Sequence, residues 1–195
     1  MNRTVERTLA ILKIIANSEH GITLQEIANQ MDMAKSSAFV IVHTLLELNY
    51  ISTVENNDKK YCLGVETFAL GMKYANNQSL VQQCVIHLPG LAEKYNKTAF
   101  LGILNGSNVV YLYKYVAENA RLATCSIGSS KPAHATALGK ALIAFLPPKA
   151  QRALLDNMEL TSYTDQTVSS KEEFIAQLEP VSYTHLRAHE TRRHL

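Results

Sequence analysis

The segment KSSAFVIVHTLLELNYI carries the side chains best suited to bind a polar partner. Its helical period predicts a helix from about Lys35 to Leu48, with Ser36 and Ser37 in the first turn. Hydroxyl, ammonium and backbone N–H groups at a helix N-terminus are suited to bind phosphate. His43, two turns further on, can reach a base edge or a phosphate. The segment therefore predicts a helix that enters the major groove of DNA.

An apolar run, Phe39-Val40-Ile41-Val42, interrupts the polar face of this helix. At about 100° per residue, one sector of roughly 80° holds the positions that predict the buried seam: Ala38, Ile41, Leu45 and Leu48. Phe39 and Val40 lie roughly 120° to 140° from the centre of that sector, on the outer face. Two interpretations are open for this pair. The side chains contact thymine methyl groups in the groove, or they pack against the hairpin or the helix that follows.

Two other groupings suggest catalytic chemistry, but neither has the complete pattern. Leu138-Gly139-Lys140-Ala141 resembles part of a phosphate-binding loop, which needs Gly at His134 and Ser or Thr at Ala141. Cys125 and His134 could act as nucleophile and base, but no third group is placed to orient them. We expect a buried cysteine and a packed or capping histidine, and we predict neither an enzyme nor a cofactor.

A third grouping, His185, His189 and Glu190, has the spacing of metal ligands on one helix face. It lies in VSYTHLRAHET, residues 181–191, which is identical to the translation of a transposon-end adapter used in DNA sequencing. We therefore expect residues 181–195 to be a non-native tail and the natural gene to continue past about Glu179. The sequence predicts no metal site.

Composition is typical of a globular protein without a membrane span. The chain has 195 residues, of which 47% are hydrophobic and 18% charged, and no apolar run approaches the ~18 residues of a transmembrane helix. Three widely spaced cysteines without a C-x-x-C pair argue against a zinc site and suit a reducing cytoplasm. Without residues 181–195 the formal charges balance at 16 basic and 16 acidic. A prediction of DNA binding therefore rests on local architecture.

The elements around the polar helix predict a winged helix-turn-helix. Residues 4–17 form a helix with one apolar face: Val5, Leu9, Leu12 and Ile15. Thr23 and Glu26 have capping-box spacing at the start of a second helix, and the helix from Lys35 ends at Asn49, a residue that tolerates the left-handed conformation. Strands at 50–54 and 60–63 flank the turn residues 55–59, with Lys59 and Lys60 at the hairpin tip. The alternative is a plain helical bundle with a hairpin.

The second half predicts an α+β domain. Residues 64–96 are helical with an interruption at Pro89-Gly90, and strands Thr98–Leu104 and Val109–Val116 flank the hairpin dipeptide Asn105-Gly106. The remaining elements follow in order: a third strand at Arg121–Ile127, helices at Ala135–Leu146 and Lys149–Asn157, and a last helix from Ser169-Ser170.

These motifs resemble those of the IclR family of transcriptional regulators over residues 4–179. The resemblance is carried by VERTLAILKIIA, ITLQEIANQMDMAKSSAFVIVHTLLELNYI, KYCLGVETFALG and, most specifically, HATALGKALIAFLPP. It implies a winged helix-turn-helix over 1–64, a linker helix over 65–79 and a partial GAF-like (profilin-like) effector domain over 80–180. It also implies a cytoplasmic homodimer or homotetramer that reads a near-palindromic operator in double-stranded DNA and binds a small organic effector.

The resemblance also implies which residues do the binding. By position, the DNA-reading helix contains Lys35, Ser36, Ser37, Phe39, Val40, His43 and Thr44. Thr23, Lys59 and Lys60 complete the predicted DNA-binding set, and for the two lysines a solvated turn is the alternative. The edge of the effector site is Ala135, Thr136, Ala137, Leu138 and Gly139. Many members of the family carry His or Arg where this chain has Phe39 and Val40. The competing hypothesis is a winged helix that contacts protein and does not bind DNA in a sequence-specific way.

Overall fold

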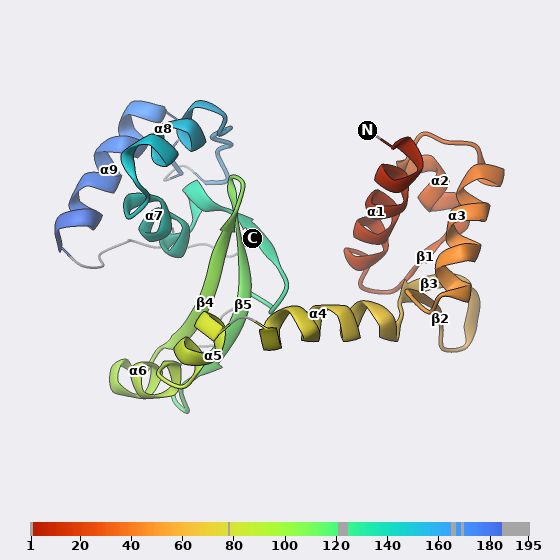
Figure 1. Ribbon diagram of the computed structural model, residues 1–195, viewed down its shortest axis with the longest axis horizontal. Coiled ribbons are helices and arrows are strands. Elements are labelled where there is room, and N and C mark those ends of the chain that lie inside the picture. The colour runs from red at the N-terminus through yellow and green to blue at the C-terminus, as the bar shows by residue number, and fades with distance from the viewer. Residues whose placement is uncertain (1, 78, 121–124, 165–166, 169, 185–195) are drawn as a thin grey trace. The chain divides into compact units, whose positions relative to one another are not determined.

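The computed structural model describes residues 2–77, 79–120, 125–164, 167–168 and 170–184. The chain divides into two compact units, Met1–Asn77 and Gln78–Leu195, which are described separately (Figure 1). Both units mix helices with a small sheet, so the predicted α+β class is confirmed. In the described residues, no helix combines the length and the apolar character that crossing a membrane requires.

The amino-terminal unit consists of a three-helix cluster, a small sheet and a following helix. The elements are α1 (Arg3–Ala16), β1 (Ile22–Thr23), α2 (Leu24–Gln30), α3 (Lys35–Glu47), β2 (Ile51–Val54), β3 (Asn57–Leu63) and α4 (Val65–Asn77). The strands pair antiparallel in the order β1-β3-β2. The sheet therefore gains one strand, β1, that the sequence pattern does not predict.

The predicted apolar face of α1 is wrong for two of its four members. Val5 and Leu9 are 53% and 55% exposed, whereas the buried residues are Ile11 and Ile15. The helix carries two apolar stripes, and only the one containing Ile11 and Ile15 meets α2, α3 and the sheet. Packing against these neighbours selects the stripe, and the period alone cannot.

The predicted seam of α3 is correct at Ala38 and Leu45, which are buried. Val42 is fully buried as well, while Ile41 is half-buried and Leu48 is 55% exposed. The prediction is wrong for Leu48 because that residue is the C-cap, and the next residue, Asn49, turns the chain away with a φ of 58°. The left-handed stop at Asn49 is as predicted.

The hairpin turn is tighter than predicted. Val54 pairs with Asn57, so only Glu55 and Asn56 connect the strands, and Asn56 adopts a φ of 62° that permits so short a turn. Lys59 and Lys60 consequently lie within β3 and not at the hairpin tip. Their predicted position is corrected on this point.

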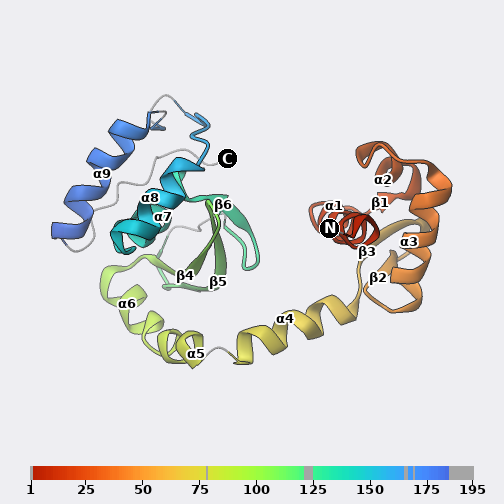
Figure 2. The same cartoon turned by 45° about the horizontal axis from the view of Figure 1, so that its top comes forward.

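The carboxy-terminal unit consists of a three-stranded antiparallel sheet with helices beside it. The elements are α5 (Ser79–Val85), α6 (Leu88–Tyr95), β4 (Thr98–Asn105), β5 (Asn108–Val116), β6 (Ser130–Pro132), the 3₁₀ turn η1 (Ala133–Ala135), α7 (Ala137–Ala144), α8 (Pro148–Asp156) and α9 (Lys171–Thr184). Helices α7, α8 and α9 lie together beside the sheet, and α5 and α6 form a separate group (Figure 2).

Among the described residues, the third strand of this unit is β6, and the predicted strand Arg121–Ile127 is only partly covered. Residues 121–124 lie outside the described part, and Cys125–Ile127 is not a strand. The edge of β5 pairs instead with β6, whose Ser130 lies opposite Val110. The predicted helical stretch 64–96 contains three helices, α4, α5 and α6. Pro89 lies in the first turn of α6, where its fixed φ is suitable.

The two faces of the sheet have different coverings. Phe100 pairs with Lys114 and Ala99 with Tyr115, so these pairs point to opposite faces. Phe100 packs against the core formed with α7 and α9, whereas the Tyr115 hydroxyl donates to Glu93 of α6 at 3.1 Å. The face that bears Phe100 therefore supports α7.

Candidate nucleic-acid interface and effector site

The first turn of α3 is open. Lys35, Ser36 and Ser37 are all exposed, and no side chain caps the helix at Ala34. Backbone N–H groups at such a terminus and the Lys35 ammonium are suited to contact phosphate. The three predicted phosphate contacts thus lie together on one accessible turn.

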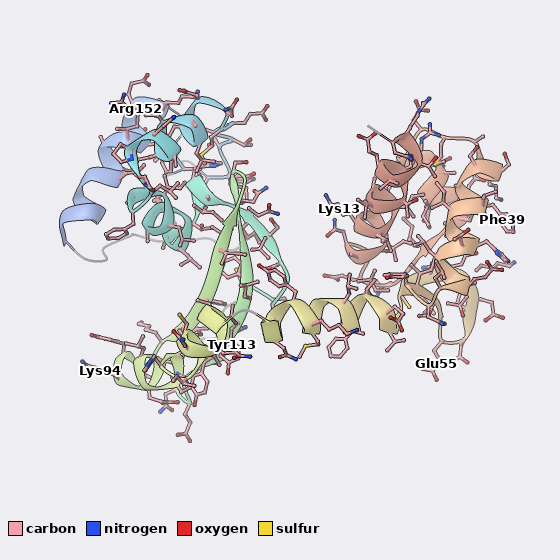
Figure 3. The ribbon with its side chains drawn as sticks, in the orientation of Figure 1. Lys13, Phe39, Glu55, Lys94, Tyr113 and Arg152 are labelled. Atoms are coloured by element: carbon pink, nitrogen blue, oxygen red, sulfur yellow. The ribbon has the colours of Figure 1, made fainter. Side chains whose placement is uncertain are left out.

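The outer face of α3 is apolar in its next turn. Phe39 is 51% and Val40 is 64% exposed, and Figure 3 shows Phe39 on the side of the helix that faces away from α1. This exposure excludes burial of the pair against the hairpin or α4 within the unit. The other interpretation, contact with a partner in the groove, is consistent with the structure.

The polar residues of the same face interact with each other. His43 Nδ1 lies 3.3 Å from Glu47 Oε1, and the ring centroid of His43 lies 5.5 Å from that of Phe39. The Thr44 hydroxyl donates to the Val40 carbonyl at 2.9 Å. Phe39, His43 and Glu47 therefore form one ordered row along the helix.

The polar groups of Thr23 are already hydrogen-bonded at the start of α2. Its hydroxyl accepts from the Glu26 N–H at 3.3 Å, and its own N–H donates to the Glu26 carboxylate at 2.8 Å. The predicted capping box is therefore present. The hydrogen bonds from the Thr23 backbone, then those from its side chain, lower the pKa of Glu26, and the charge of Lys60 acts in the same direction.

The predicted DNA-binding residues fall into two groups. One group lies along α3 and consists of Lys35, Ser36, Ser37, Phe39, Val40, His43 and Thr44. The other group lies on the sheet, where Thr23 of β1 pairs with Lys60 of β3 and the exposed Lys59 is adjacent. The sequence missed this second association because a two-residue strand has no detectable period.

The predicted effector edge is the junction between η1 and α7. Thr136 is the N-cap of α7, and its hydroxyl accepts from the Gly139 N–H at 3.0 Å. Gly139 is buried so closely against Ala133 that a Cβ would overlap the Ala133 backbone. Ala135, Ala137 and Leu138 are half-buried, and Leu138 packs against the core. The five residues thus form one compact turn.

Two polar residues next to this junction, His134 and Lys140, and one on β5, Lys114, were not among the predicted site residues. His134 is 2% exposed, with Nε2 3.0 Å from the Thr161 carbonyl oxygen and its ring stacked on Tyr163. It is packed, as expected. Lys140 donates to Gln177 at 2.8 Å, and burial lowers the pKa of Lys140. Lys114 donates to the Cys125 carbonyl at 3.4 Å. The sequence feature that could have identified these residues is a polar residue type within an apolar stretch.

Sequence comparison identifies both units. The model of the IclR helix-turn-helix domain matches residues 4–55, and that of the bacterial transcriptional regulator IclR C-terminal domain matches residues 72–184. The chain belongs to the IclR family of bacterial transcriptional regulators. The resemblance inferred from the motifs is therefore confirmed, as is the combination of an N-terminal helix-turn-helix domain with an IclR effector domain.

Individual relatives agree with the family assignment. The HTH-type transcriptional regulator XynR of Escherichia coli is 32% identical over 90% of this chain and 69% of its own length. The IclR-family regulator of Alicyclobacillus acidocaldarius has the same fold, with a TM-score of 0.79 at 22% identity over 94% of this chain and 74% of that one. A homologue from Microbacterium hydrocarbonoxydans, solved with 4-hydroxybenzoate, gives a TM-score of 0.74 at 17% identity over 92% of this chain and 74% of that one.

This chain spans only part of its relatives. It covers between 58% and 69% of the first curated relatives that it matches. The predicted tail, residues 181–195, starts within α9, which ends at Thr184, while residues 185–195, including His185, His189 and Glu190, lie outside the described residues.

Proposed function

We propose that this protein is a ligand-responsive, DNA-binding transcriptional regulator. The observation that carries the proposal is the exposed outer face of α3 with its open first turn, in a helix-turn-helix domain of the IclR family. In a helix-turn-helix motif the second helix, which is α3 in this protein, is the one that enters the major groove. The family's effector domain in the same chain supplies the ligand response.

The proposed binding residues are those of the two groups described above. Lys35, Ser36, Ser37, Lys59 and Lys60 contact phosphates, with Thr23 nearby, and Phe39, Val40, His43 and Thr44 face the bases. The η1–α7 junction, residues 135–139, borders the effector site. The proposed domains are the winged helix over 1–64, the linker helix over 65–79 and the effector domain over 80–180.

The proposed working form is a cytoplasmic homodimer or homotetramer on a near-palindromic operator. Exposed apolar side chains on α1 and α4 support association through the amino-terminal unit: Val5 and Leu9 on α1, and Val65, Phe68, Leu70 and Met72 on α4. Apolar surface of this kind marks interaction sites. A two-fold symmetric protein in turn requires two related half-sites in the DNA.

The test is footprinting of the full chain on the DNA that flanks its own gene, followed by affinity measurements against salt concentration. We expect protection of two half-sites and a steep loss of affinity with salt, because each phosphate contact releases counterions. Lys35→Ala and Lys59→Ala should each reduce the salt slope by about one unit, without changing which sequence is bound.

Lys149→Ala is the matched control, since Lys149 is an exposed lysine of the other unit, and its salt slope should equal that of the wild type. Absence of protection by the folded protein at every concentration would overturn the proposal. If in addition the amino-terminal unit bound a protein with little salt dependence, the competing hypothesis of a protein-contacting winged helix would be favoured.

A further inference from the structure

We propose that the middle of α3 reads its operator through the 5-methyl groups of thymine and not through hydrogen bonds to purine edges. The inference rests on the proposed function and concerns the chemistry of the base contacts. Phe39 and Val40 are the specificity-determining residues, and the ligand class is double-stranded DNA with thymine at the contacted steps.

Beyond its first turn, α3 lacks the residue types that make the common bidentate contacts with bases. Bidentate recognition of guanine needs Arg or Lys, and that of adenine needs Asn or Gln. Residues 38–47, AFVIVHTLLE, contain none of these four types. The only strongly basic side chain on the helix is Lys35, in the first turn, where recognition helices also meet the backbone.

His43 and Thr44, two polar side chains of the outer face, make contacts within the helix. The Thr44 O–H donates to the Val40 carbonyl at 2.9 Å, so its single donor is used. His43 Nδ1 lies 3.3 Å from the Glu47 carboxylate, and the His43 ring contacts Phe39. Base-edge hydrogen bonds from Thr44 or His43 Nδ1 would have to break these contacts first.

Apolar surface is what remains for the groove. Phe39 and Val40 expose 51% and 64% of their surface on adjacent positions one turn into the helix. Residues in the amino-terminal half of a recognition helix contact base edges, and the thymine methyl is the apolar group that the major groove offers. The Phe39 ring also contacts the His43 ring, with the centroids 5.5 Å apart.

Glu47 limits which part of the DNA can lie against the outer face of α3. A carboxylate that faces DNA is repelled by phosphates, and the Glu47 carboxylate lies 3.3 Å from His43 Nδ1. The row Phe39–His43–Glu47 is therefore compatible with a position over the bases and unfavourable over the backbone. A thymine-rich groove floor fits the apolar pair Phe39 and Val40.

The experiment separates the methyl group from the rest of the base. Duplexes that the full chain selects from a random library are resynthesised with deoxyuridine in place of thymidine, one position at a time, which removes only the methyl. We expect each contacted position to lose about fourfold in affinity, and symmetric changes in both half-sites to lose more than about tenfold.

Two variants link that loss to the named side chains. Phe39→Ala and Val40→Ala should weaken binding to thymine-containing duplex and show no further loss with deoxyuridine at the position that each contacts, because the two changes remove one interaction. Phe145→Ala is the matched control, since Phe145 is 57% exposed in the other unit. This control should retain the full deoxyuridine effect.

The outcomes distinguish this inference from the proposed function. Salt-dependent, sequence-specific binding with equal affinity for thymidine and deoxyuridine duplexes would overturn the methyl readout and leave the regulator function intact. A deoxyuridine loss that persists at the same base position in both Phe39→Ala and Val40→Ala would also overturn it. If the folded chain selected no duplex at all, both proposals would fall together.

Discussion

Replacing Thr23 with alanine tests whether the main role of this residue is to cap helix α2. The Thr23 hydroxyl accepts from the Glu26 N–H at 3.3 Å and donates to the Glu26 carboxylate at 2.7 Å. Alanine removes both hydrogen bonds but retains the backbone N–H that donates to the same carboxylate at 2.8 Å. One half of the capping box is therefore lost and the other half is kept.

The magnitude follows from the exposed position of these bonds. Glu26 is exposed, so its freed N–H can be hydrated, and no buried polar group is left without a partner. The loss should be near the typical value for a Thr cap, about 1 kcal/mol within a range of about 0.5 to 2. At about 1.4 kcal/mol for a factor of ten, this is roughly a fivefold increase in the opening of α2.

Amide hydrogen exchange measured by mass spectrometry on the full chain is the suitable assay. A global melt would combine two units and need not be two-state, whereas exchange reports α2 separately from α7. We expect peptides covering Leu24–Gln30 to exchange about fivefold faster in Thr23→Ala, while peptides covering Ala137–Ala144 remain unchanged.

Thr23→Ser is the matched control because serine caps at least as well as threonine. It should exchange like the wild type. The capping argument is refuted if Thr23→Ala leaves the α2 peptides unchanged, or if Thr23→Ser accelerates them as much as alanine does. In DNA binding, a role for Thr23 confined to capping predicts that Thr23→Ser has wild-type affinity.

Two further predictions concern pH and close packing. The pKa of Glu26 is below its ordinary value of 4.5, so its ionised form stabilises α2 above that pH, and this contribution is lost as pH falls through the lower folded value. The protection of the α2 amides, corrected for intrinsic exchange, should therefore decline in that pH range in the wild type and not in Glu26→Gln. An equal decline in both proteins would contradict the prediction. Gly139→Ala should lower the unfolding free energy of the carboxy-terminal unit by about 1 to 3 kcal/mol or more, because the added methyl overlaps the Ala133 backbone. Gly71→Ala is the control because a Cβ at Gly71 meets nothing within 4 Å, and it should stabilise α4 by up to about 1 kcal/mol. Urea denaturation followed by hydrogen exchange in each unit measures the two variants separately. Equal effects of Gly139→Ala and Gly71→Ala would be inconsistent with the packing argument.

Local signals in the sequence predicted much of the fold. The Thr23–Glu26 capping box, the left-handed Asn49 and the Asn105-Gly106 hairpin each depend on residues within a few positions of one another. Such interactions are encoded in the chain itself, and the structure contains all three. The family motifs predicted both domains, and the two family models match them.

Errors arose where a residue has more than one possible partner. On α1, Leu9 and Ile11 are equally apolar, yet one is exposed and the other buried. The third strand of the second sheet is at Ser130–Pro132 because that segment reaches the edge of β5. Neither outcome follows from composition or period, since both depend on which distant segment is nearby.

The candidate site divides in the same way. The sequence by itself determined that α3 has a polar first turn and an apolar outer pair at Phe39 and Val40, because helical geometry assigns each side chain a direction. Only the tertiary structure decided that this pair stays exposed and that Thr23 is joined to Lys60 by a sheet. Burial and strand pairing are contacts between segments far apart in the chain, and they are formed only when the whole unit folds.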